Sequence, residues 1–433
     1  MRSRVEKYQR GRPTVAAEGG SLGRLLAIPR VRAVAIASAL ARMPFAMGGV
    51  ALIIFVHSRT GSFGDAGAVA AAFTLAFAVA GPVLGRLVDR RGPRSVLLPG
   101  ATLSSLAVLA VVVLGEQRAP LVALLLVAAV AGAAMPPISG ILRRAWPSMV
   151  EPEEVPSAYL LDSILIETIF ITGQLLTGVL AVAIDPAAPL VFAAAAGVAG
   201  TAWFVVRPEI AEIPPSPHDH RSRMGAMASP TIRLLVVTGI PIGFTFGALD
   251  VALPAFGAGH GSAAIGGLLT AMLGVGSVIG GVVYGIYGSR LGDLRQACLR
   301  LAAIQPLLSL LLLLAPSPLA MVLPAMLAGT YTAPIITVRS RIAQIAMPPG
   351  TGTETFTWIL LAVMVGVSAG SLLAGPVVEA TSWRAGVGLA VALPLAALPI
   401  LIAAREYLPR DDRSGPVVTS MGREGVRVPA SDG

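Results

Sequence analysis

Charged residues are scarce in this chain, and their scarcity excludes most soluble folds. Only 13% of the 433 residues are charged, while 55% are hydrophobic. A soluble domain carries about 25% charged residues. The net charge of +9 is basic, but the basic residues lie between apolar runs and form no single block. We therefore expect a membrane protein whose arginines set its orientation in the lipid bilayer, and no nucleic-acid partner.

Several kinds of functional group are also missing. Cys298 is the only cysteine, which excludes an internal disulfide and a cysteine metal cluster. The four histidines are scattered along the chain. The sequence contains no metal-ligand spacing, no nucleotide-binding loop and no soluble catalytic domain. We therefore predict no metal, no cofactor and no enzymatic activity, and any transport has to use an ion gradient or the solute gradient itself.

Apolar runs of about 20 residues recur along the whole chain, and this is the length a helix needs to cross a bilayer. They predict an all-α integral membrane protein with twelve transmembrane helices, near residues 31–56, 65–88, 95–114, 119–142, 158–183, 187–206, 232–256, 262–287, 297–315, 318–340, 355–379 and 384–404. The chain then divides into a tail (1–30), a six-helix bundle (31–206), a proline-rich connector (207–231), a second six-helix bundle (232–404) and a second tail (405–433).

The arginines between the runs predict the orientation. One set of loops is rich in arginine, while the opposite loops contain only Arg59, Arg118 and Arg384. Loops rich in Lys and Arg stay in the cytoplasm. We therefore expect a multi-pass protein of the cytoplasmic (inner) membrane with both termini in the cytoplasm.

The two halves of the chain are related. A shift of 197 residues places Pro137 on Pro334 and Gly173 on Gly370, without gaps. Proline and glycine matches are informative because Leu and Ala matches arise easily by chance in apolar sequence. The shift predicts a duplicated six-span unit, and duplicated halves suit alternating access to a site between them.

A charged hairpin separates the second and third runs. We expect the apolar helix to stop within residues 85–89 and the next to start after Gly92 and Pro93, which form a turn. Topology alone does not require an acid at Asp89, so we expect this carboxylate to have a partner on another helix. The gate motif of this hairpin consists of Gly85, Asp89, Arg90, Gly92 and Arg94.

This hairpin, together with six spans, a loop and six spans, resembles the major facilitator superfamily over about residues 30–405. The resemblance implies two pseudo-symmetric six-helix bundles and a gate in which Asp89 meets the start of a second-half helix in the outward-open state. Two departures leave the coupling ion and the direction of transport open. Residues 128–132 lack the arginine of many proton-driven members, and span five has only Gly173 and Gly178 of the glycine-rich exporter pattern.

Ionisable groups inside the membrane are the candidates for substrate binding and proton coupling, because each costs at least about 2.5–3.5 kcal/mol there. Arg42 and Glu167 both lie roughly 14–17 Å from the inner surface at 1.5 Å per residue. We therefore expect them to neutralise each other if their helices touch. Asp250 lies toward the outer end of span seven and is a further candidate.

Two polar residues complete the candidate set. Gln174 lies seven residues after Glu167, so it shares the same helix face. Asp162 points elsewhere, and we expect it to meet Arg143 or Arg144.

Matching prolines in the two halves indicate a transport site independently of the charged residues. Pro44 in span one and Pro241 in span seven each lie beside glycines. Proline removes a helical hydrogen bond, and matching interruptions in two halves point to a transport site. We expect both helices to break there and to line the cavity.

Together these features predict a monomeric secondary active transporter that exports a small amphipathic molecule in exchange for protons. Uptake by symport or facilitated diffusion on the same fold is the first alternative. A non-transporting receptor or scaffold is the second, and it would have an apolar interior or a large extramembrane domain.

Overall fold

The computed structural model describes residues 23–211, 225–287, 293–348 and 351–409. The regular secondary structure of these residues is helical, as expected where the backbone has to satisfy its own hydrogen bonds inside lipid. Twelve segments of the described chain are long and apolar enough to cross a membrane. The twelve predicted spans are therefore confirmed.

The twelve spans follow one another along the chain. The first six are α3 (Pro29–Thr60), α4 (Phe63–Arg91), α5 (Pro93–Glu116), α6 (Leu121–Ala133) with α7 (Ile138–Met149), α8 (Val155–Ala183) and α9 (Ala188–Val205). The second six are α11 (Pro230–Ala258), α12 (Ile265–Tyr287), α13 (Leu294–Leu310), α14 (Pro318–Gly329) with α15 (Thr332–Ala346), α16 (Gly352–Ala380) and α17 (Trp383–Ala403).

The predicted tails, 1–30 and 405–433, lie mostly outside the described residues, and so does the middle of the predicted connector, 207–231. The described parts of the connector are the short helix α10 (Pro208–Ala211) and a 3-10 turn (Gly225–Ala228).

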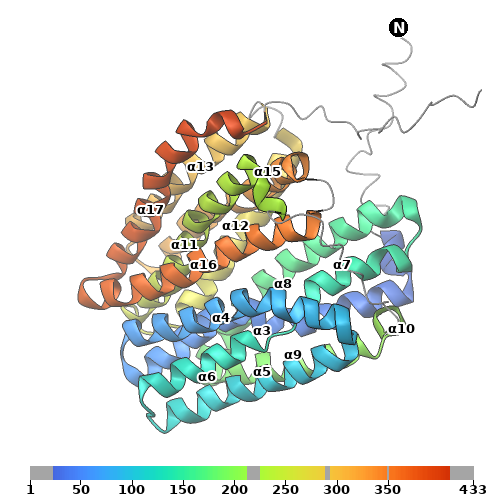
Figure 1. The fold of residues 1–433 in the computed structure, drawn as a ribbon. Coiled ribbons are helices and arrows are strands. Elements are labelled where there is room, and N and C mark those ends of the chain that lie inside the picture. The colour runs from blue at the N-terminus through green and yellow to red at the C-terminus, as the bar shows by residue number, and fades with distance from the viewer. Residues whose placement is uncertain (1–22, 212–224, 288–292, 349–350, 410–433) are drawn as a thin grey trace, which may run out of the picture.

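Helices α3–α9 gather on one side of the molecule and α11–α17 on the other (Figure 1). Within the first group α3 packs on α4, α8 and α9, and within the second α11 packs on α12, α16 and α17. The groups meet mainly where α4 contacts α16 and where α8 contacts α12. The fold is thus two six-helix bundles joined along two helix pairs.

The duplication inferred from the sequence is visible in the packing. A Cβ at Gly132 would overlap the carbonyl oxygen of Phe73, which brings α6 against α4. A Cβ at Gly329, which lies 197 residues further on, would overlap the carbonyl oxygen of Leu273 and brings α14 against α12. Both glycines permit a helix crossing in which one backbone touches the other.

The contacts between the bundles gather toward one end of the helices. We call this the Ser62 end, and the opposite end, where α4 turns into α5, the Gly92 end. Glu379 at the end of α16 accepts hydrogen bonds from the Ser62 hydroxyl (2.7 Å) and from the Gly64 amide (2.9 Å) at the start of α4. Further in, about two to three turns along the helices, Ser368 donates to the Ala71 carbonyl (2.9 Å). The first third of α4 is therefore bound to the last part of α16.

The charged hairpin folds as a tight turn, but one detail differs from the prediction. Gly92 adopts φ 82° between α4 and α5, and Pro93 begins α5. The α4 helix does not stop within residues 85–89. It continues to Arg91, because the Gly92 amide still donates to the Val88 carbonyl (2.8 Å). The gate motif is therefore mostly the last turns of a helix.

The predicted breaks at Pro44 and Pro241 are wrong. Both prolines lie inside continuous helices, α3 and α11. Pro44 is turned toward α9, since a Cβ at Gly197 would lie 2.6 Å from its ring. Neighbouring helices tolerate a transmembrane proline in this way. Pro44 packs within the first bundle, and Pro241 lies beside α13 and α17 of the second.

Matching interruptions do occur, but in spans four and ten. Span four breaks between α6 and α7, just before Ile138, and span ten breaks between α14 and α15, just before Thr332. Pro137 and Pro334 lie close to these breaks and correspond under the shift of 197 residues. The halves therefore share their irregularities as well as their straight helices.

Candidate functional site

A buried ion pair joins α3 to α8. The Arg42 Nη2 atom lies 2.9 Å from Asp162 Oδ1, and the two side chains are 6% and 1% exposed. The second carboxylate oxygen of Asp162 lies 3.4 Å from Nε of Arg143, a half-exposed residue of α7. The expected contact between Asp162 and Arg143 is therefore present.

The expected pairing of Arg42 with Glu167 is wrong. Asp162 and Glu167 are five residues apart on one helix, which places them about 140° apart around its axis. Asp162 therefore faces α3 and α7, while the Glu167 carboxylate lies beside Ser277 of α12. The position along the helix axis puts both Asp162 and Glu167 near the depth of Arg42. The direction in which each acid points around the α8 axis determines that Arg42 pairs with Asp162.

The Arg42 guanidinium keeps unused donors. Its Nε and Nη1 atoms are buried and have no hydrogen-bond partner among the described residues. Together with Asp162 and Arg143 it forms a group of two cations and one anion. This group therefore has spare N–H groups and one positive charge in excess.

Glu167 and Asp250 lie where the two bundles meet. Glu167 faces α12 of the second bundle. Asp250 on α11 faces α3 of the first bundle, because its Oδ2 atom would lie 3.7 Å from a Cβ at Gly49. Within the described part of the chain, no arginine, lysine or histidine lies within salt-bridge distance of either carboxylate.

Gln174 on α8 forms a contact with α3 inside the first bundle. Its Nε2 donates to the Ala46 carbonyl (2.9 Å), and its buried Oε1 has no partner in the described residues. Gly173 allows the approach, since a Cβ there would lie 3.0 Å from the Ala46 side chain. One acceptor beside the α3–α8 contact therefore remains free.

The gate residues lie at the Gly92 end. Arg90 and Arg94 are exposed, and a Cβ at Gly85 would meet nothing within 4 Å. The side chain of Asp89 lies outside what the structure describes, and so does its expected contact with a second-half helix.

Two residues with notable contacts were missed by the sequence reasoning. Glu379 was placed at the last position of a predicted span, and nothing local indicates its bond to α4. Arg339 is the last residue but one of the predicted span 318–340 and was given no role in transport, but it lies inside α15 and is 5% exposed. Its position inside an apolar run, seven residues before the end of α15, was the available signal.

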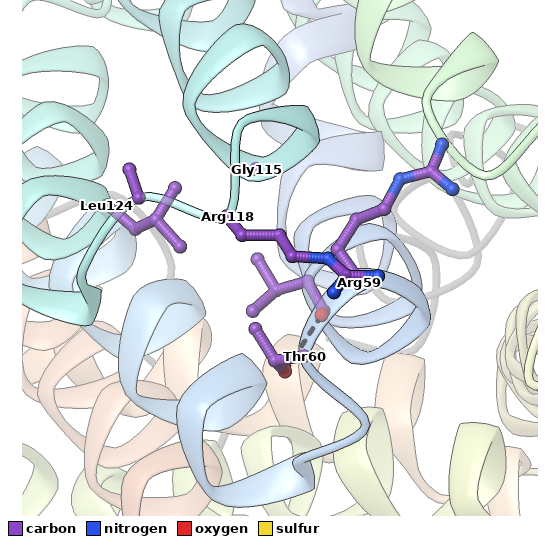
Figure 2. A pocket seen from close by; sticks show the side chains of 7 residues that line it. Arg59, Thr60, Gly115, Arg118 and Leu124 are labelled. Carbon is purple, nitrogen blue, oxygen red and sulfur yellow. Dashed lines mark hydrogen bonds between the residues drawn. The ribbon is translucent and has the colours of Figure 1, made fainter.

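A surface pocket of about 300 Å³ lies at the Ser62 end, away from the buried pair. Figure 2 shows Arg59, Arg118 and Thr60 around it, with the Thr60 hydroxyl bonded to the Val56 carbonyl (2.9 Å). Arg59 is already neutralised by Glu116 (2.6 Å) and Asp185 (3.1 Å). All lining residues belong to the first bundle.

Comparison with known proteins points to one family. The sequence model described as Major Facilitator Superfamily matches residues 34–228, somewhat less than half of the chain. The match and the twelve apolar helices support a multi-pass membrane transporter of this type. No curated protein sequence matches the chain.

Solved transporter structures share the fold of this chain. A mutant of the nucleoside transporter NupG has a TM-score of 0.71 at 14% identity, over 86% of this chain and 98% of the other. An auto-inhibited POT family peptide transporter has a TM-score of 0.66 at 13% identity, over 89% and 98%. At such identities the likeness concerns the fold alone.

Proposed function

We propose that this protein is a secondary active transporter that works by alternating access. The observation that carries the proposal is the position of the contacts between the bundles. The described hydrogen bonds of α4 with α16 involve the Ser62 end of both helices. Gly178 and Gly267 bring α8 and α12 together in the same half of the molecule. A rocking motion of the bundles would break these contacts and close the Gly92 end.

We further propose that the Gly92 end and both termini lie in the cytoplasm, in the inner membrane of the cell. The arginine distribution between the spans supports this orientation. The Ser62 end would then be the outer side, closed in this conformation.

Single cysteines test this orientation. In a Cys298→Ala background, cysteines at Ser62 and Gln117 are expected to react with an impermeant thiol reagent added from outside, while a cysteine at Ser216 is expected not to react. Labelling at each position is measured in intact cells, with lysed cells as the control for reactivity. Outside labelling of position 216 would contradict the proposed orientation.

Proton-coupled export of an amphipathic solute fits the residues at the bundle interface. Glu167 and Asp250 are acids without a basic partner in the described structure, whereas Asp162 is held by two arginines. Phe45 lies close to Phe77 and Phe170, with ring centroids 4.8 and 5.4 Å apart. These rings offer an apolar surface one turn from Glu167. Glu167 is therefore the first candidate for the coupling proton, and Asp250 is the second.

Glu167→Gln tests the coupling. Glutamine keeps the shape of the side chain but removes the titrating group, so proton-driven accumulation is expected to be lost while solute exchange down a gradient remains. Both are measured in proteoliposomes with and without a pH gradient. Glu116→Gln, an exposed acid of a surface ion pair, is the matched control and should behave as wild type. Wild-type accumulation by Glu167→Gln would remove this residue from the mechanism.

Asp89→Asn tests the gate at the Gly92 end. The change removes a charge whose contact with a second-half helix would form only when that end closes, so initial transport rates are expected to fall about tenfold, corresponding to roughly 1.4 kcal/mol. Insertion and folded yield should remain at the wild-type level, and size-exclusion chromatography measures them. An unchanged transport rate would mean that this hairpin only sets the orientation of the protein in the membrane and is not a gate.

Uptake by symport is the second candidate, and the same interface supports it. Transport by inside-out and right-side-out vesicles distinguishes the two directions. Accumulation in inside-out vesicles driven by an acidic lumen supports export.

A further inference from the structure

A buried cation in the second bundle has no counter-charge among the described residues. Arg339 on α15 is 5% exposed. Its Nη1 donates to the Thr238 hydroxyl (2.8 Å) and its Nη2 to the Leu235 carbonyl, both on α11. In the described chain, no Asp or Glu lies within salt-bridge distance of this guanidinium. Neutral partners satisfy its hydrogen bonds but leave its charge uncompensated inside a membrane span.

The first bundle can be compared with the second around this arginine. Under the shift of 197 residues, Arg42 corresponds to Gly239 and Asp162 to Ile359. A Cβ at Gly239 would lie 3.3 Å from Nη2 of Arg339. The guanidinium of the second bundle therefore lies at the position on α11 that corresponds to Arg42 on α3, although it comes from span ten.

The carboxylate that pairs with Arg42 has no equivalent. Ile359, at the position corresponding to Asp162, packs against the apolar cluster that contains Leu235 and Val338. In the part of the chain that the structure describes, one bundle thus holds a cation with its anion, and the other holds a cation without one.

A small, mostly apolar cavity borders this guanidinium. It has a volume of about 30 Å³ and is lined by Thr238, Gln305, Cys298 and Arg339, with Pro241 and Pro394 among its apolar walls. A cavity of this size holds about one or two water-sized atoms. It therefore suits the oxygen atoms of a small charged group and not a whole solute.

We propose that Arg339 binds an anionic group, a carboxylate or a phosphate, of the transported solute. This inference rests on the proposed function and narrows its solute to organic anions. A guanidinium matches both groups because its planar N–H donors engage two oxygens at once. The excess positive charge of the Arg42, Asp162 and Arg143 group favours the same sign of solute. The solute's anion neutralises Arg339 as Asp162 neutralises Arg42 in the first bundle.

Binding is measured by the thermal unfolding of the purified full chain in an uncharged detergent, with benzoate, benzamide and inorganic phosphate as probes. Wild-type protein is expected to be stabilised by benzoate or phosphate and not by the neutral benzamide. Arg339→Gln is expected to weaken this effect at least tenfold in the apparent Kd. Arg341→Gln, which changes an exposed arginine two residues further on, is the matched control and should bind as wild type.

Ile359→Asp supplies the missing carboxylate from the protein and keeps the test decisive if Arg339→Gln does not fold. This variant is expected to remain folded and to lose the response to benzoate and phosphate, because its own carboxylate neutralises Arg339. An unchanged anion response in Ile359→Asp or in Arg339→Gln overturns the inference.

Reconstitution into vesicles distinguishes binding of a solute from binding of a lipid head group. Vesicles of phosphatidylcholine alone are compared with vesicles that contain phosphatidylglycerol. Stabilisation by phosphatidylglycerol, with no response to benzoate or phosphate, overturns the assignment to solute. A wild-type protein that accumulates only neutral solutes also overturns it and leaves the transporter proposal intact. Arg339-dependent anion binding without any transport contradicts only the transporter proposal.

Discussion

Alanine in place of Asp162 is expected to destabilise the folded protein by about 3–5 kcal/mol, because it leaves a buried guanidinium without its counter-ion. Arg42 is 6% exposed and its Nη2 atom donates to this carboxylate at 2.9 Å. Two further nitrogens of Arg42 already have no partner in the described structure. Asp162 is therefore the one acid within salt-bridge distance that compensates this charge.

The loss is measured as the shift in denaturant-induced unfolding in detergent micelles. Asp185→Ala removes a carboxylate in the loop after α8, where it pairs with the partly exposed Arg59. It is the control, because exposed pairs contribute only about 0–1 kcal/mol.

Removing both charges together is expected to recover most of the stability. In Arg42→Met with Asp162→Leu, apolar side chains of similar size fill the space and no buried charge remains unpaired. Glu167→Ala is expected to give no such recovery in an Arg42→Ala background, because Glu167 faces another helix. A double variant at positions 42 and 162 that is no more stable than Asp162→Ala alone would contradict the pair.

Alanine at Gly243 or at Gly247 is expected to cost about 1–3 kcal/mol each, because the crossing of α11 and α16 leaves no room for a side chain. A Cβ at Gly243 would overlap the carbonyl oxygen of Val363, and a Cβ at Gly247 would overlap that of Val367. The two glycines are four residues apart and share one helix face. They form a small-residue contact of the kind that joins transmembrane helices.

The consequence should extend beyond the second bundle. Helix α16 also packs on α4 of the first bundle, so a shift of α16 is expected to weaken the bond between Glu379 and Ser62 as well. Folded yield and the thermal unfolding midpoint measure the effect. Gly388→Ala is the matched control, since a Cβ at that position on α17 meets nothing within 4 Å. Wild-type stability of both Gly243→Ala and Gly247→Ala would contradict the close crossing.

Features that depend on local chain properties were predictable from the sequence. The twelve spans follow from apolar runs long enough to cross a bilayer, and the structure places their ends within a few residues of the predictions, apart from spans four and ten, which continue to Met149 and Ala346. The turn at Gly92 follows from a glycine before a proline. Gly276 and Gly280 are four residues apart, a spacing that favours close helix packing, and both permit α12 to touch span ten. Each of these features is determined by a few neighbouring residues.

Only the tertiary structure decided which groups meet. The partner of Arg42 depends on the rotation of α8, which turns Asp162 toward α3 and Glu167 toward α12. The continuity of α3 at Pro44 depends on the space that Gly197 of α9 leaves for the proline ring. The isolated charge of Arg339 is visible only when α11 is placed beside α15. A hydrophobic run fixes the length and depth of a helix, but its rotation and its neighbours result from the packing of all twelve helices together.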